Sequence, residues 1–167
     1  GSRIGSRCLI GPDSTIDNSI LGDFCEINSS IVEDAKLDNR VEVGPFSHIR
    51  EGTLLEDSVH IGNYTEIKNS HLGKGTKSGH FSYLGDADIG TNVNIGAGTI
   101  TCNYDGKDKH RTLIGDEAFI GCDTMLVAPI NIGRRALTGT GSIVTKDVPA
   151  DSKAIGSPAR ILKGGRS

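Results

Sequence analysis

Aliphatic side chains recur along this chain at intervals of six residues. The spacing is visible from Ile4 onward and is most regular in the second half, at Ile114, Ile120, Leu126, Ile132, Thr138 and Val144. An α-helix would place apolar residues three and four apart, and a half-buried strand would alternate every second residue. A six-residue period instead fits a parallel β-helix, in which a strand of about four residues alternates with a two-residue turn. Three such units would close a triangular coil of about 18 residues, so the chain would form about nine coils.

The composition agrees with a stack of thin repeats. The 167 residues include four Phe, three Tyr and no Trp, too few aromatic side chains for a conventional globular core, but they include 23 Gly. A Gly often follows the aliphatic residue, as in Ile89-Gly90 and Ile95-Gly96. We expect these Gly residues to turn tight corners with positive φ, and the aliphatic residues to stack inward as the core.

Charge and cysteine content limit the function classes. The net charge is −3 without a long run of one sign, so nucleic acid and anionic membranes are not expected partners. The cysteines Cys8, Cys25, Cys102 and Cys122 show no zinc-type spacing, and we expect reduced, mostly buried thiols and no metal site. We see no signal peptide or membrane-spanning apolar run and expect a cytoplasmic protein. The repeat is already under way at Ile4, which leaves room for a longer natural chain.

Three segments depart from the six-residue repeat. In residues 74–78 (KGTKS) the aliphatic position is lost just before His80. Residues 101–112 (TCNYDGKDKHRT) form a polar insertion, which we expect to be a loop that carries binding residues. From Val148 onward, we expect two prolines to delimit a short strand at 154–155, and residues 159–163 to form a helical turn. We therefore divide the chain into a β-helix, 1–147, and a C-terminal cap or tail, 148–167, that covers the open strand edge.

The repeat predicts which polar residues meet. Arg50 and Lys68 are 18 apart, so their side chains should emerge from neighbouring coils about 4.8 Å apart. Two cations at that distance repel unless an anion lies between them, and a phosphate is the natural candidate. The alternative is a pair of solvated surface cations that splay apart.

His80 is the best-placed candidate base in the sequence. It follows the disturbed segment, and an ordinary histidine pKa of about 6.5 suits proton acceptance. Possible orienting groups lie downstream, at Tyr83, Asn94, Asn103 and Tyr104. Because it lies two faces beyond Lys68, a second subunit could supply the other wall of a site. The alternative is an ordinary surface histidine.

Four blocks of the sequence carry a family resemblance: 43–50, 60–63, 79–87 and 92–106, the last reading NVNIGAGTITCNYDG. They closely resemble the acetyltransferase domain of the bacterial bifunctional N-acetylglucosamine-1-phosphate uridyltransferase/glucosamine-1-phosphate acetyltransferases. The resemblance implies an all-β, left-handed parallel β-helix that assembles as a homotrimer with active sites between subunits. It also implies acetyl-CoA-dependent conversion of glucosamine-1-phosphate to N-acetylglucosamine-1-phosphate, a step towards UDP-N-acetylglucosamine and the cell wall. The uridyltransferase domain, which uses Mg²⁺, has no counterpart in these residues.

The resemblance also implies residue roles. His80 would be the general base that deprotonates the sugar amine. Substrate-binding residues would be Arg50, Lys68, Tyr83, Asn94, Asn103 and Lys109, the first two and Lys109 binding the phosphate. Residues along the acetyl-CoA groove would be Asn103, Tyr104, Cys122, Thr140 and Arg160.

The chain departs from the family in two places, and other functions stay open. Cys122 stands where the family commonly has Ser, and the ending 156–160 (GSPAR) is closer to the wider sugar acyltransferases, which puts the C-terminal acetyl-CoA contacts in doubt. One alternative is an acyltransferase for another amino-sugar phosphate or a nucleotide sugar. A second is a metal hydratase resembling the γ-type carbonic anhydrases, although His60, His71 and His80 are not spaced to share a face. A third is a non-catalytic trimerisation stalk of a sugar nucleotidyltransferase.

Overall fold

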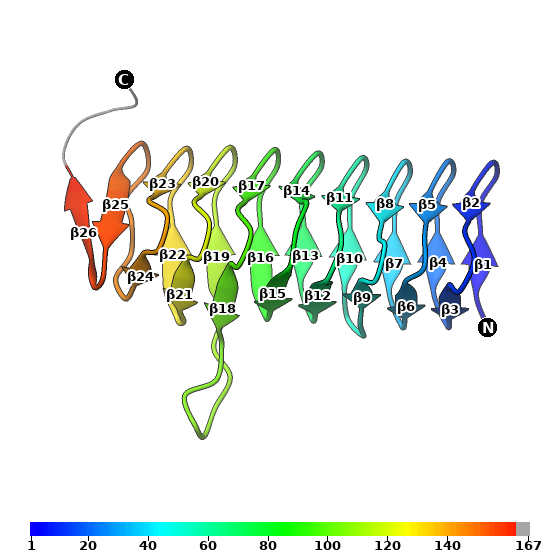
Figure 1. The fold of residues 1–167 in the computed structure, drawn as a ribbon, viewed down its shortest axis with the longest axis horizontal. Coiled ribbons are helices and arrows are strands. Elements are labelled where there is room, and N and C mark those ends of the chain that lie inside the picture. The colour runs from blue at the N-terminus through cyan, green and yellow to red at the C-terminus, as the bar shows by residue number, and fades with distance from the viewer. Residues whose placement is uncertain (163–167) are drawn as a thin grey trace.

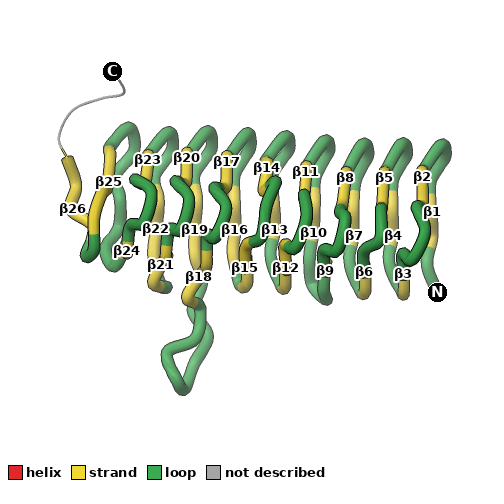
Figure 2. The backbone as a smooth tube through the Cα atoms, viewed as in Figure 1, coloured by secondary structure: helices red, strands yellow, loops and turns green. Residues whose placement is uncertain are grey.

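Short parallel strands stack into three sheets in the computed structural model, which describes residues 1–162. Consecutive strands join different sheets in turn, so each coil gives one strand to each face of a prism, and the coils lie side by side along its length (Figure 1). This confirms the parallel β-helix of about nine coils. Residues 1–162 contain no helix, and hence none that could cross a membrane (Figure 2).

The strands, numbered in chain order, fall into three sheets, called A, B and C. Sheet A consists of β1 (Arg3–Ile4), β4 (Ile20–Leu21), β7 (Lys36–Leu37), β10 (Leu54–Leu55), β13 (His71–Leu72), β16 (Ala87–Ile89), β19 (Thr112–Ile114) and β22 (Ile130–Ile132). Sheet B consists of β2 (Leu9–Ile10), β5 (Glu26–Ile27), β8 (Glu42–Val43), β11 (His60–Ile61), β14 (Lys77–Ser78), β17 (Asn94–Ile95), β20 (Phe119–Ile120), β23 (Leu137–Thr138), β25 (Lys153–Gly156) and β26 (Ala159–Leu162). Sheet C consists of β3 (Thr15–Asp17), β6 (Ile31–Glu33), β9 (His48–Ile49), β12 (Thr65–Lys68), β15 (Ser82–Gly85), β18 (Ile100–Cys102), β21 (Met125–Val127) and β24 (Ile143–Val144).

Coil length varies along the prism, so the expected coil of about 18 residues holds for only some of the coils. Glu42 pairs with His60, as the expected coil length requires. Glu26, however, pairs with Glu42 where that length would give Gly44, and Glu66 pairs with Tyr83 where it would give Leu84. Backbone pairing fixes the strands, whereas a corner can lose a residue without disturbing them. The six-residue spacing therefore predicts well which residues point into the core. It predicts only locally which residues pair between neighbouring coils.

The predicted aliphatic ladders form the core. Ile61, Ile89 and Ile120 are fully buried, and so are most other members of the repeat. Ile4 and Ile10 have 49% and 41% of their surface exposed, and Ile16 is partly buried, because the first coil has a neighbour on one side only.

Most corner glycines that follow an aliphatic residue are required by close packing, whereas the expected positive φ is confirmed at Gly44, where φ is 116°. A Cβ on Gly62 would lie 1.8 Å from the carbonyl oxygen of Gly79 in the next coil, and one on Gly96 would lie 2.5 Å from the amide nitrogen of Cys122. The positive φ falls shortly after such a glycine, for example on Tyr64 (59°). Stacked corners at strand spacing leave no room for a side chain at the glycine position.

Two of the three predicted departures differ in the structure. Residues 74–78 do not break the coil, because Lys77–Ser78 forms β14 and Ser78 occupies the inward position between Ile61 and Ile95. The insertion is a loop, as expected, and projects from the prism between β18 and β19 (Figure 1).

All four cysteines are free, but only Cys25 is buried and Cys122 is exposed, so the expected burial of the thiols holds only in part.

The C-terminal segment ends in a hairpin, not in a helical turn. The predicted strand at 154–155 is confirmed as β25, which pairs with β23. Residues 159–162, expected to be helical, form β26 antiparallel to β25, while Lys163 lies outside the described residues. The chain reverses after Gly156, whose φ is 105°, and β26 pairs with the edge that β25 would expose. The division between β-helix and cap at residue 147 stays a prediction.

Ser78 gives a test of the core. Its side chain is fully buried, and its hydroxyl makes no hydrogen bond to the described residues. Ser78→Ala should raise the free energy of unfolding by about 1 kcal/mol, because it removes a buried polar group without a partner. Urea denaturation measures this.

Thr76→Val is the matched control. The buried Thr76 hydroxyl donates to the carbonyl oxygen of Gly90 at 2.7 Å and accepts from the amide of Val93 at 3.0 Å. This variant should therefore lower the stability. Destabilisation by both variants would show that the Ser78 hydroxyl contributes to folding.

Candidate active site

The outer face of sheet C carries the two predicted phosphate-binding cations. Arg50 directly follows β9, and Lys68 ends β12. Ile49 of β9 pairs with Ile67 of β12, so Arg50 and Lys68, one residue further along each chain segment, lie side by side. The backbone of Arg50 is held there, since its amide donates to the carbonyl oxygen of Ile67 at 2.8 Å. The predicted one-coil spacing of Arg50 and Lys68 is thus confirmed.

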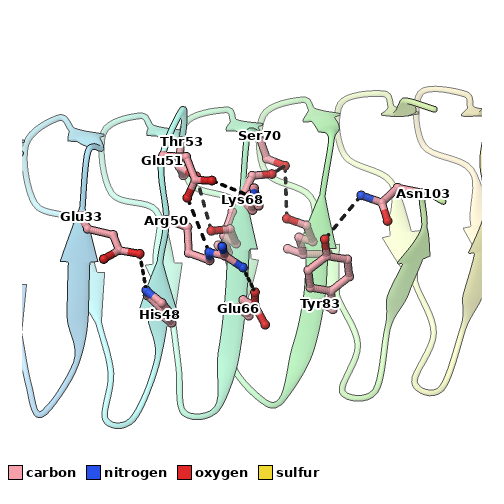
Figure 3. Close-up of polar contacts among 12 residues, drawn as sticks. Glu33, His48, Arg50, Glu51, Thr53, Glu66, Lys68, Ser70, Tyr83 and Asn103 are labelled. Carbon is pink, nitrogen blue, oxygen red and sulfur yellow. Dashed lines mark hydrogen bonds and ion pairs between the residues drawn. The ribbon is translucent and has the colours of Figure 1, made fainter. Parts of the chain in front are cut away.

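The anion between these cations is a carboxylate of the protein itself (Figure 3). One oxygen of Glu51 lies 2.7 Å from Lys68 Nζ, and the other lies 3.5 Å from Arg50 Nε. The hydrogen bond from Lys68 is the largest cause that holds the pKa of the Glu51 carboxyl below its ordinary value. At its other end, Arg50 donates from Nη1 to Glu66 Oε1 at 2.8 Å, which is the main cause of its raised pKa. Arg50 Nε is buried and makes no hydrogen bond to the described residues.

Further along the same face, Tyr83 and Asn103 meet. Tyr83 lies in β15, and Asn103 follows β18 and is buried. The Asn103 amide lies 3.4 Å from the Tyr83 hydroxyl and donates to Asp86 at 2.5 Å. Asp86, itself buried, also accepts from Asn69 at 2.5 Å. Its carboxylate therefore ties the start of the inserted loop to the preceding coils.

His80 lies at the corner between sheets B and C, and two of the proposed acetyl-CoA residues share that edge. The amide of Gly98 bonds to the carbonyl of Phe81, that of Asp123 to Ala97, and that of Gly141 to Cys122, at 2.6–2.8 Å. These bonds stack the corners that hold His80, Cys122 and Thr140 along one edge of the prism. The side chains of all three are exposed. The His80 imidazole makes no hydrogen bond to the described residues.

The remaining predicted residues lie elsewhere on the chain. Asn94 is exposed on sheet B and Arg160 is exposed on β26. Tyr104 and Lys109 form a bridge within the loop, and the Tyr104 hydroxyl donates to the carbonyl oxygen of Gly106 at 2.7 Å. The loop stands away from the prism (Figure 1), so one chain does not bring Lys109 to Arg50.

Asp105 organises the loop that carries Lys109. Its carboxylate accepts from the backbone amides of Lys107 and Asp108, both at 2.8 Å, and lies 2.7 Å from His110 Nε2. The contact with His110 and then those two amides hold the pKa of Asp105 well below its usual range. The loop tip therefore has a defined conformation although its side chains are exposed.

The three histidines of the hydratase alternative do not share a face, as their spacing predicted. His60 lies on sheet B against Glu42, at 2.7 Å. His71 lies on sheet A between Glu56 and Asp88, at 2.8 and 3.1 Å. With His80 at the B–C corner, each histidine has a separate environment within one chain.

Sequence reasoning missed Glu51, Glu66 and Asp86. Glu51 and Glu66 are ordinary surface residues by sequence, and only the stacking of β9 on β12 brings them to the two cations. Asp86 falls inside the resembling block 79–87, which was the available signal, and the structure places it at a corner with φ of 51°.

Comparison with known proteins gives the family. Residues 111–146 match the family model of the hexapeptide repeat of succinyl-transferase. The chain is 51% identical over 164 residues to the bifunctional protein GlmU of Streptococcus equi and 50% identical to that of Thermotoga maritima. Each alignment covers 98% of this chain but only 36% and 37% of the relative. Over the part that it spans, this chain belongs to the GlmU family.

Solved structures agree with the fold of a GlmU-family β-helix. Soybean serine acetyltransferase in complex with serine is 36% identical over 56% of this chain and 40% of its own, with a TM-score of 0.51. Arabidopsis UDP-N-acetylglucosamine acyltransferase superposes on 96% of this chain and 69% of its own with a TM-score of 0.63, at 18% identity. This chain spans just over a third of the length of its GlmU relatives.

Proposed function

We propose that this chain transfers the acetyl group of acetyl-CoA to the amine of glucosamine-1-phosphate. The observation that carries the proposal is the Arg50–Lys68 pair on sheet C, at the opposite edge of that sheet from the exposed His80. The GlmU relatives at about 50% identity support it. The product, N-acetylglucosamine-1-phosphate, would lead to UDP-N-acetylglucosamine.

The proposed chemistry needs a base but no metal ion. The amine nitrogen attacks the thioester carbonyl carbon, a nitrogen–carbon bond forms, and the carbon–sulfur bond breaks. His80 takes a proton from the attacking amine, and the departing thiolate of coenzyme A gains a proton. The base is required because a protonated amine has no lone pair, and a positioned base contributes roughly 10²- to 10⁴-fold in rate.

The other residues bind the two substrates in this proposal. Arg50 and Lys68 hold the sugar phosphate, as a bidentate fork and a point charge respectively. Tyr83 and Asn103, joined through their side chains, contact the sugar. Residues that would line the acetyl-CoA groove are Tyr104, Asn103, Cys122, Thr140 and Arg160.

We further propose that the active unit is a homotrimer and that it works in the cytoplasm. Asn94 and Lys109 lie on parts of the chain that do not face its own Arg50, and a neighbouring subunit would present them. An aromatic ladder, Phe46, Tyr64 and Phe81, runs along the B–C corner with 58%, 61% and 56% of its surface exposed. Phe46 and Tyr64 stack at 5.5 Å. A second copy of the chain would cover this apolar edge.

A thiol-release assay tests the function and the phosphate site together. The protein should release coenzyme A from acetyl-CoA with glucosamine-1-phosphate and much more slowly with glucosamine. Arg50→Ala should raise the KM for glucosamine-1-phosphate about tenfold or more and leave that for acetyl-CoA nearly unchanged, because the lost contact is a remote binding contact. Arg40→Ala, which removes a cation on another corner, is the control. No turnover in the wild type would leave the stalk alternative.

His80 is tested separately through kcat. His80→Ala should lower kcat by about 10²- to 10⁴-fold with little change in either KM or in the melting temperature. Raising the pH should partly restore the rate, because more of the amine is then neutral. His71→Ala, on sheet A, should keep the wild-type kcat. A His80 variant within a few-fold of wild type would remove this residue from the mechanism.

The trimer is tested at the aromatic ladder. Light scattering should give three times the 17.6 kDa of one chain. Tyr64→Glu should produce smaller species, because it places a charge in the proposed contact. Phe24→Glu changes an aromatic residue that is 46% exposed on a different corner and should leave the mass unchanged. A wild-type monomer at micromolar concentration contradicts the trimer.

A further inference from the structure

A carboxylate of the chain lies between the two cations of the proposed phosphate subsite. Glu51 offers one oxygen to Lys68, at 2.7 Å, and the other to Arg50 Nε, at 3.5 Å (Figure 3). Two oxygens shared between the two cations are what a phosphate ester would also present. Glu51 therefore stands where the substrate phosphate would bind in the proposed function.

The arrangement leaves Arg50 incompletely paired. Its Nη1 donates to Glu66 at 2.8 Å, but its Nε is buried and makes no hydrogen bond to the described residues. Glu51 is close enough to Nε for attraction but too far for a hydrogen bond. A phosphate oxygen placed between the cations could pair with both Nε and Lys68, so exchange of the carboxylate for a phosphate would gain a charge-assisted hydrogen bond.

The charges show that the two groups cannot share the site. Arg50 and Lys68 carry two positive charges, which Glu51 and Glu66 balance. A phosphate monoester, mostly dianionic above its second pKa of about 6, would add its charge to a neutral cluster if Glu51 stayed. Once the Glu51 carboxylate moves out, the cluster carries one net positive charge and favours the anion.

Glu51 can leave the gap between the two cations without moving the backbone. The Glu51 side chain is 47% exposed and lies at the corner before Gly52, and its carbonyl oxygen accepts from the amide of Asn69 at 2.9 Å. A change of side-chain rotamer is enough to bring its carboxylate into solvent. Glu66 lies within β12 and fixes the far side of the Arg50 guanidinium.

We propose that Glu51 is an internal competitor of the substrate phosphate and sets the affinity of this subsite. The inference rests on the proposed function for the identity of the substrate. A ligand that binds only when Glu51 has moved out has its dissociation constant divided by the fraction of open sites. Every anion that needs the gap therefore loses affinity by the same factor, whatever its charge.

The test compares Glu51→Gln and Glu51→Ala with wild type at low ionic strength. Both variants should lower the KM for glucosamine-1-phosphate about two- to fivefold, the range that one partly exposed ion pair supports. The KM for acetyl-CoA should not change. Calorimetry should show tighter binding of methyl phosphate and, by a similar factor, of the monoanion methyl sulfate.

Glu33→Gln is the matched control. Glu33 lies on the same face, 2.9 Å from His48, so this variant removes one negative charge without vacating the Arg50–Lys68 gap. Its effect measures long-range charge alone and should be smaller than that of Glu51→Gln. Equal effects of the two variants, or an effect on the dianion only, would overturn the competitor role. A raised KM in Glu51→Gln would also overturn it and show that Glu51 positions Lys68 for the substrate.

The two proposals fail in different ways. Binding of methyl phosphate does not need acetyl transfer, so absence of turnover with the expected calorimetric shifts would reject the proposed function and keep Glu51 as a competitor for anions. Normal turnover with unchanged affinities in both Glu51 variants would reject the competitor and keep the function.

Discussion

Backbone pairing between successive coils is the interaction on which the rest of this structure depends. Each strand bonds to the strand one coil away, and the corners stack at the same distance, about 4.8 Å. That distance excludes a Cβ at Gly62 and Gly96, restricts the interior to single rows of aliphatic side chains, and aligns outward residues of neighbouring coils. The same constraint that leaves a thin core also gives the surface a fixed spacing, on which the candidate site is built.

Fixed spacing explains why charge balance dominates the face of sheet C. Arg50 and Lys68 cannot move apart along the axis, so their repulsion has to be offset by anions. Glu51 and Glu66 supply these anions. In the proposed competition, anion binding is an exchange between a tethered carboxylate and a phosphate, and its affinity depends on the difference between two similar interactions. Without the Glu51 carboxylate, Arg50 and Lys68 would bind an anion more tightly. Their two positive charges would then be unbalanced whenever the anion is absent.

The sequence predicts the features that follow from the six-residue period. It does not predict the features that depend on contacts between residues of different coils. The six-residue spacing was enough for the β-helix, the buried ladders, the projecting loop and the meeting of Arg50 with Lys68. It could not give the variation in coil length, because the length of a corner does not alter the inward pattern. Residues 159–162 (ARIL) are mostly helix formers, but pairing with the edge of β25 makes them a strand. Glu51 and Asp86 were missed because their partners lie one coil away, in contacts that side-chain rotamers decide.

In the proposed function, the distribution of polar groups around the prism leaves one chain without a complete site. The cations proposed to bind the phosphate, Arg50 and Lys68, lie on sheet C near its corner with sheet A. The opposite edge, where sheet B meets sheet C, carries His80, Cys122 and Thr140. A single flat face cannot enclose a substrate between these edges, and the inserted loop points away from them. The face becomes a cleft only when another surface is placed against it. The exposed aromatic ladder runs along the same edge as His80, so a contact that buries these rings would also bring a neighbouring subunit close to the proposed base. Burial of apolar surface and assembly of the active site are in this way coupled, and loss of one should weaken the other.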